Sequence, residues 1–149
     1  MKKNRITRLT EQEQKILQQV KQKPEIVMQI QNPSEEFLQV AVCINPFIIN
    51  FVHNPSYIVR LRAVRQNGLV LEYIKERTPE IEMAAVRQNG MSIRFIEKPS
   101  RDIQIAALTQ NMKSYEFITN PHPDASGMFF EHTKKVVYSP GIGLGIYTR

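Results

Sequence analysis

The sequence predicts an all-α protein, an α-solenoid of about five 22-residue repeats with two short helices in each. The main observation is a six-residue motif, Ala63–Gly68, which recurs unchanged at Ala85–Gly90. Weaker copies lie one period away on either side, at 41–45 and 107–111. Prolines share one column of the repeat, and apolar residues keep their type in several others. Self-similarity at constant spacing is typical of stacked helical repeats.

Composition and charge narrow the class of protein. The chain has 149 residues, 42% of them hydrophobic, which suits one domain with a buried core. Residues 1–23 carry seven basic and two acidic side chains, whereas residues 24–120 carry ten of each, so the net charge of +6 belongs mostly to one end. No apolar run reaches the roughly 18 residues of a membrane span. The single cysteine, Cys43, excludes an internal disulfide and predicts a reducing compartment such as the cytoplasm.

The period divides the chain into two parts. We expect a helical repeat domain over residues 1–120, including a basic N-terminal end at 1–9, and a short irregular or β-like C-terminal extension over 121–149. Thr10-Glu11-Gln12-Glu13 has capping-box spacing and predicts the start of the first helix. A degenerate copy of the repeat follows this helix, and we expect it to cap the array.

Each later repeat begins with a hydroxyl residue suited to cap a helix. These residues are Ser34, Ser56, Thr78 and Ser100. The first helix of a repeat is expected to run for about 10–12 residues. It ends at an asparagine, and Gly68, Gly90 or Pro46 then starts a second helix of about seven or eight residues. We expect Asn67 and Asn89 to cap or turn the chain there, rather than to bind the backbone of a partner.

Two columns predict the packing between repeats. Alanine recurs at 41, 63, 85 and 107, which favours close approach of neighbouring helices. An aromatic residue recurs at 51, 73, 95 and 117, next to aliphatic columns. Aromatic rows can stack bases, but the aliphatic neighbours favour a buried spine for this one.

Arginine and glutamine side chains of the repeats are the candidate partner-binding residues. At about 100° per residue, Arg65 and Arg87 point away from the alanine row, one repeat apart. Their guanidinium groups could hold carboxylates or phosphates, or could simply form a solvated face. The full candidate set is Arg60, Arg62, Arg65, Arg87, Gln66, Gln88 and Gln110.

Other polar residues offer weaker candidates. Lys2, Lys3, Arg5 and Arg8 form the candidate nucleic-acid contact, with a solubilising terminus as the alternative. The three histidines show no metal-ligand spacing, so no metal or cofactor is predicted. Cys43 lacks the context of a nucleophile and is expected to be buried. No set of nucleophile, base and oxyanion donors emerges, and the sequence therefore predicts no enzyme.

The C-terminal segment departs from the period. The residues 121–124 are expected to end the array, and 134–138 to form a strand. A run of alternating glycine and apolar residues follows at 141–146. It could cover the apolar end of the last repeat or dock on a partner as an added strand.

The copies at 63–74 and 85–96 resemble a helical repeat family of unknown function, built on A-V-x-Q-N-G and common in large DNA viruses, phages and some microbes. The spacing is also similar to leucine-rich variant repeats. The resemblance covers about residues 31–120, but Ile44-Asn45-Pro46 and Met112 depart from the motif. It implies an α-solenoid and supplies no catalytic residues.

Repeated positions build an extended surface, which favours recognition over chemistry. We therefore expect a non-enzymatic protein-binding module, and the resemblance implies a viral or phage accessory protein that docks on or inhibits a larger host or viral machine, in the host cytoplasm if viral. A nucleic-acid-binding accessory protein is the alternative. The sequence leaves self-association open.

Overall fold

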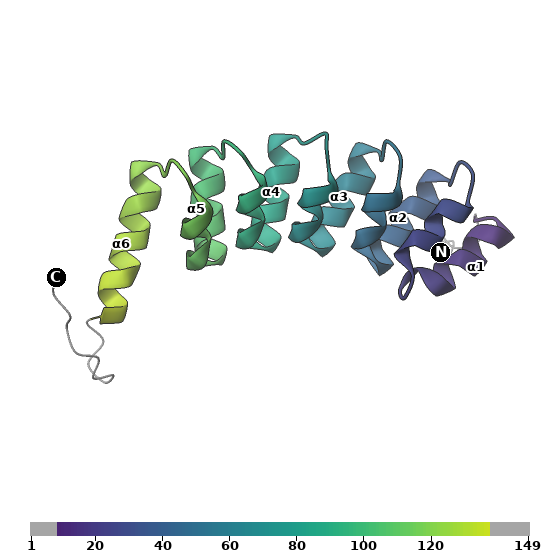
Figure 1. Ribbon diagram of the computed structural model, residues 1–149, viewed down its shortest axis with the longest axis horizontal. Coiled ribbons are helices and arrows are strands. Elements are labelled where there is room, and N and C mark those ends of the chain that lie inside the picture. Colours follow the sequence, from purple (N-terminus) through teal and green to yellow (C-terminus); the bar gives the residue numbers. More distant parts are fainter. Residues whose placement is uncertain (1–8, 138–149) are drawn as a thin grey trace, which may run out of the picture.

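The computed structural model describes residues 9–137, of which the side chains are described as far as residue 134. Helices stand side by side in one row, with α1 at one end of that row and α6 at the other (Figure 1). The α-helices are α1 (Glu11–Val20), α2 (Glu35–Ile44), α3 (Tyr57–Gln66), α4 (Pro79–Gln88), α5 (Arg101–Gln110) and α6 (Pro123–Val137). Short 3₁₀-helices alternate with them: η2 (Pro24–Gln29), η3 (Pro46–Phe51), η4 (Gly68–Tyr73), η5 (Gly90–Phe95) and η6 (Met112–Phe117). The described residues contain no strand, and the α-solenoid prediction is confirmed.

The second helix of each repeat is shorter and tighter than expected. It is a six-residue 3₁₀-helix, whereas the sequence predicted seven or eight helical residues. Its backbone bonds span three residues, as from the Val70 N–H to the Asn67 carbonyl at 3.2 Å. Six residues are too few for hydrophobic spacing to separate a period of 3.0 from one of 3.6.

Side-chain caps set the start of every α-helix from α1 to α5. Thr10 and Glu13 form the predicted capping box of α1. The four predicted hydroxyl caps also accept from the third residue of their helices, as in the 3.1 Å bond from the Phe37 N–H to Ser34 Oγ. The asparagine column caps the 3₁₀-helices: the Asn67 side-chain oxygen accepts from the Leu69 N–H at 3.0 Å. Its predicted role in capping is confirmed.

The core lies between the α-helices and the 3₁₀-helices. The alanine column, Ala41, Ala63, Ala85 and Ala107, is fully buried in all four copies. Aliphatic residues on both sides of it are buried as well, among them Val64 and Leu71. Stacked repeats therefore bury apolar faces that a single helix pair would leave in water.

Glycine is required at the start of η4 and η5 by a close approach between repeats. A side-chain carbon added to Gly68 would lie closer than 3.0 Å to the Ala85 carbonyl oxygen and 2.7 Å from Ser92 Oγ. Gly90 meets the equivalent atoms of Ala107 and Ser114. The sequence predicted these glycines as turn residues, and the structure adds that neighbouring backbones leave no room for a methyl group.

Arg77, which stands where other repeats have proline, also links repeats. Arg77 Nε donates to the Ile74 carbonyl at 2.7 Å, and its terminal nitrogen donates to the carbonyl of Phe95. These bonds tie the loop after η4 to the end of η5. The guanidinium of Arg77 thus satisfies two backbone acceptors, whereas a proline at this position would only restrict the backbone conformation.

The C-terminal prediction was wrong for the residues that the structure describes. Residues 123–137 form α6, which packs on α5, so residues 121–124 do not end the stack and 134–137 are not a strand. Thr133 stands where earlier repeats carry the capping asparagine, and no Gly or Pro follows it, so the helix continues. Residues 138–149, with their glycine-rich run, lie outside the described residues.

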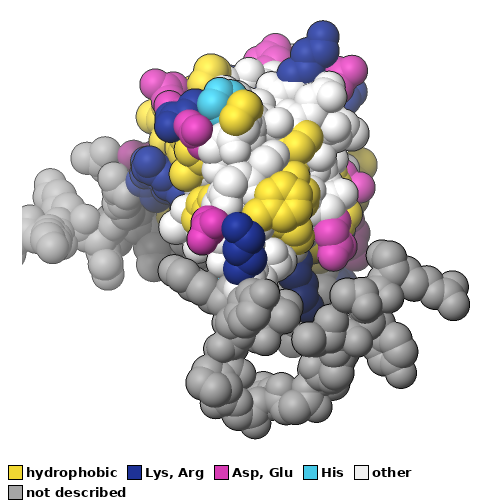
Figure 2. Space-filling model, turned by 90° about the vertical axis from the view of Figure 1, so that its left-hand side faces the viewer, with side chains coloured by type: hydrophobic (Ala, Val, Ile, Leu, Met, Phe, Trp, Pro, Cys, Tyr) yellow, Lys and Arg dark blue, Asp and Glu magenta, His cyan; other side chains and the backbone are white. Residues whose placement is uncertain are grey.

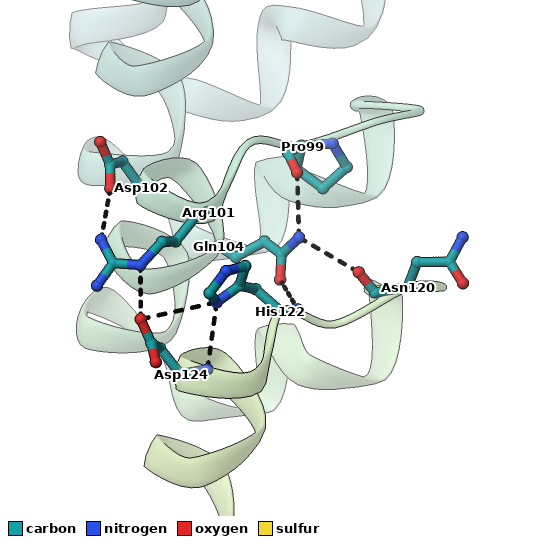
Figure 3. A network of polar contacts seen from close by, with 7 residues as sticks. All are labelled: Pro99, Arg101, Asp102, Gln104, Asn120, His122 and Asp124. Carbon is teal, nitrogen blue, oxygen red and sulfur yellow. Dashed lines mark hydrogen bonds and ion pairs between the residues drawn. The ribbon is translucent and has the colours of Figure 1, made fainter.

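A polar network holds α6 to the stack (Figure 3). The side chain of Gln104, 5% exposed, donates to the Pro99 and Asn120 carbonyls and accepts from the His122 N–H at 2.8 Å. Arg101 Nε donates to Asp124 Oδ2 at 2.6 Å, and this hydrogen bond lowers the pKa of the Asp124 carboxyl.

Two burial predictions were wrong. In the aromatic column, Tyr73 and Phe117 are 38% and 37% exposed, and Phe51 and Phe95 are only half-buried. In η3, η4 and η5 the third and fourth positions are buried, whereas the aromatic residue comes last and lies at the rim. Cys43 is exposed because it occupies the outward column of Arg65 and Arg87.

Candidate functional site

An open groove of about 650 Å³ lies between α3 and α4. Among the residues that the structure describes, only those of these two α-helices line it, so it faces away from the 3₁₀-helices. Leu61, Met83 and Ala84 are half-buried and form an apolar middle section. Tyr57, 39% exposed, lies where the helices begin, and its hydroxyl bonds to Glu80 Oε2 at 3.3 Å.

Two arginines line the other end of this groove. Arg65 and Arg87 stand in the last turns of α3 and α4, and both are exposed. No acidic side chain within residues 9–134 forms an ion pair with either of them. The structure therefore brings together these two predicted site residues, with free guanidinium groups beside apolar surface.

The other two predicted arginines lie elsewhere. Arg60 is 13% exposed, and its terminal nitrogen bonds to the Glu76 carbonyl at 2.6 Å and to the Glu76 carboxylate at 3.0 Å. Arg62 is half-buried, with its terminal nitrogen 3.9 Å from Cys43 Sγ. Neither of them lines the groove.

The predicted glutamines have a structural role in two of three copies. Gln88 Oε1 accepts from the Gly68 N–H, and Gln110 Oε1 accepts from the Gly90 N–H, both at 2.5 Å. The equivalent partner of Gln66 would be Pro46, which has no N–H to donate. Hydrogen bonds between repeats thus engage the side-chain oxygens of Gln88 and Gln110.

A second surface lies along the 3₁₀-helices. The rings of Phe47 and Tyr73 meet edge to face with centroids 6.4 Å apart, and both are exposed. Arg94 lies over the ring of Phe95, with its guanidinium carbon 4.7 Å from the centroid. A cavity of about 440 Å³ lies between residues 49–55 and 73–76, at the ends of η3 and η4 and the loops that follow them. Aromatic surface therefore follows this edge over several repeats.

A third surface is the α6 end of the stack, where hydrophobic side chains reach the surface between charged ones (Figure 2). The rings of Tyr115 and Phe129 stack with centroids 4.1 Å apart, and Phe130 is 54% exposed. Phe130 stands in the column of Val64 and Val86, which the following elements bury completely.

Three further sequence predictions concern the basic N-terminus, metal binding and membrane spans. Lys2, Lys3, Arg5 and Arg8 lie outside the described residues. Within the described part of the chain, no three His, Cys, Asp or Glu side chains gather in a way that could hold a metal ion. None of the helices there is long and apolar enough to cross a membrane.

Sequence reasoning missed Tyr57, Leu61, Glu80 and Met83 as groove residues. A signal was present, because positions 57, 61 and 65 share one helix face and positions 79, 83 and 87 repeat it 22 residues later. Spacing alone does not show whether such a face packs on the core or lines an open groove, because this depends on the elements that pack against it.

Comparison with known proteins gives one family match. Residues 59–99, from α3 through η5, match the model of a domain of unknown function, DUF4116. Neither the curated proteins nor the solved structures gave a match to this chain.

Proposed function

We propose that this protein is a non-enzymatic protein-binding module, and that the α3–α4 groove receives a segment of the partner. The groove carries the proposal, because it exposes Leu61 and Met83 to solvent beside two arginines that have no ion-pair partner among residues 9–134. The alanine row and its aliphatic neighbours already close the core beneath it. Apolar surface with a polar rim is typical of interfaces that bind protein.

The wider setting is also part of the proposal. A viral or phage accessory protein, docking on or inhibiting a larger host or viral machine, is supported only by the repeat resemblance. The cytoplasm is supported by the single, exposed Cys43. Nucleic acid is less favoured as the partner, because the repeats carry balanced charge and Glu76 engages Arg60.

Peptide selection tests the proposal. Phage displaying random 12-residue peptides are selected on the immobilised full-length protein, and the enriched peptides are synthesised and titrated by fluorescence polarisation. Leu61→Ser/Met83→Ser should weaken binding by about tenfold or more, because apolar side chains at the centre of an interface carry much of its energy.

The matched control changes the opposite edge. Tyr73→Ser/Phe117→Ser removes exposed rings of the aromatic column and should leave affinity within about twofold, because surface changes away from a contact have small effects. Thermal unfolding checks that both variants fold. Loss of binding in the control variant alone would move the site to the aromatic edge, and failure to enrich any peptide would refute the proposal.

A further inference from the structure

The α3–α4 groove is electrically polar along its length. Glu80 lies where the two helices begin, and Arg65 and Arg87 lie in their last turns. Eight residues of α-helix separate Tyr57 from Arg65, which corresponds to about 12 Å. Apolar side chains fill the distance between, chiefly Leu61 and Met83. A bound segment would therefore meet negative charge, then apolar surface, then positive charge.

This pair of arginines occurs at one junction of the stack. The equivalent residues are Cys43 in α2 and Thr109 in α5, and neither of those helices has a basic residue in its last turn. A basic residue near a helix C-terminus is favoured by the helix dipole. That effect acts equally on all four helices, and so it does not explain why only two adjacent ones carry arginine.

Guanidinium groups bind carboxylates with two parallel hydrogen bonds. Arg65 and Arg87 lie on neighbouring helices, are exposed, and have no ion-pair partner in residues 9–134, so their donors are available to an acidic side chain. At the opposite end, the Tyr57 hydroxyl donates to Glu80 Oε2, and Glu80 is the only charged side chain that lines this end among the described residues.

We infer, resting on the proposed function, that the partner segment is an acidic peptide: apolar residues lie on Leu61 and Met83, and an Asp or Glu at one end binds Arg65 and Arg87. Like charge at Glu80 disfavours the reverse orientation. The charge at each end of the groove thus selects an acidic partner and favours one direction of binding.

The test uses the peptides selected above on the full-length protein. Enriched sequences should carry Asp or Glu on one side of an apolar core. One such peptide is synthesised together with its Asp→Asn or Glu→Gln form, and both are titrated against wild type and Arg65→Gln/Arg87→Gln. The acidic peptide should bind about tenfold more weakly to the variant, whereas the neutral peptide should bind both proteins alike.

Two controls make the result specific. Lys98→Gln/Lys113→Gln removes the same amount of charge at exposed positions outside the groove, and should leave binding unchanged. In the reversed pair, Arg65→Glu/Arg87→Glu should regain affinity for a peptide whose acidic residue is replaced by Lys. Thermal unfolding of each variant separates lost binding from lost folding.

The outcomes separate this inference from the proposed function. Peptides that bind at Leu61 and Met83 but show no acidic preference would overturn the inference and leave protein binding intact. Failure of both the library and a synthetic acidic peptide to bind would overturn both. Tighter, Arg65- and Arg87-dependent binding of a DNA or RNA oligonucleotide, weakening steeply with salt, would replace the acidic peptide with a nucleic acid.

Discussion

The side-chain oxygen of Gln88 accepts a hydrogen bond from the backbone N–H of Gly68, which lies 20 residues earlier and in the preceding repeat. Its amide nitrogen donates to the Gln66 carbonyl at 3.3 Å. One side chain thus joins the end of α4 to both the end of α3 and the start of η4. It provides the buried Gly68 N–H with an acceptor that water cannot easily supply.

Gln88→Ala should lower the free energy of unfolding by about 1–3 kcal/mol, because it leaves the Gly68 N–H without an acceptor. Gln66→Ala is the matched control, since Pro46 offers no N–H, and it should change stability by less than about 0.5 kcal/mol. Urea denaturation followed by circular dichroism measures both. Equal losses would show that the amide bond between repeats contributes nothing specific.

Gly68→Ala should destabilise the protein by about 1–3 kcal/mol, because the added methyl group collides with the Ala85 carbonyl and Ser92 Oγ. Gly127 provides the contrast, because it lies within α6 and a methyl group added there would meet open space. Gly127→Ala should therefore stabilise the protein by about 0.5–1 kcal/mol through helix propensity. A melting temperature of Gly68→Ala equal to or above that of wild type would contradict the close approach at Gly68.

Glu13 should contribute stability that acid removes. Burial by itself would raise the pKa of its carboxyl, but hydrogen bonds from Ser34 and Thr10 outweigh burial and lower it. The contribution is therefore complete above the ordinary value of 4.5 and is lost as the pH falls below it. Glu13→Gln should cost about 1–3 kcal/mol at pH 7, and the difference from wild type should shrink in acid.

Denaturation of both proteins between pH 7 and pH 3 measures this change. Glu11→Gln, in the same turn but exposed, controls for net charge. A Glu13→Gln deficit that stays constant over this range would show that the charged form of Glu13 is not what the fold stabilises.

Glu82 should behave in the opposite way. Desolvation by burial raises the pKa of its carboxyl, and the nearby charge of Arg77 only partly offsets this. The ionised form is therefore less stable in the folded protein, and protein stability should rise as the pH falls through the folded pKa. Glu82→Gln is expected to be more stable than wild type at neutral pH, with the gain vanishing in acid.

Chemical denaturation across the same pH range tests this, with the exposed Glu97→Gln as the charge-matched control. A Glu82→Gln variant less stable than wild type at pH 7 would mean that attraction to Arg77 exceeds the cost of burial.

Much of the fold was predictable because the period repeats local signals with a direct physical meaning. Ser34 and Asn67 cap helices because their side chains satisfy free N–H groups, which requires no knowledge of distant residues. Tyr73 was predicted to be buried because its aliphatic neighbours are, but its exposure depends on the rim position that a 3₁₀-helix gives it. The extent of α6 depended on the absence of a stop signal at Thr133, whereas the prolines at 121 and 123 favoured an end to the array.

The site was less predictable because it depends on relations between repeats. Arg65 and Arg87 could be placed on an outward face from helical spacing alone. The ion pair of Arg60 depends on a loop sixteen residues away, and the role of Gln88 as an acceptor depends on Gly68 in another repeat. Neither contact can be recognised from the sequence of a single helix.

The pairing of a glycine N–H with the glutamine of the following repeat makes the order of the units matter. Exchanging the units that contain α3 and α4 would keep two such pairs, because each brings both a glycine and a glutamine. Exchanging those that contain α2 and α3 would set Gly68 opposite Ile44, which has no acceptor, and Pro46 opposite Gln88, which would then have no donor. Repeats with the same period are therefore not freely interchangeable. The stability of chains with the repeats in a different order would show which repeats can be neighbours.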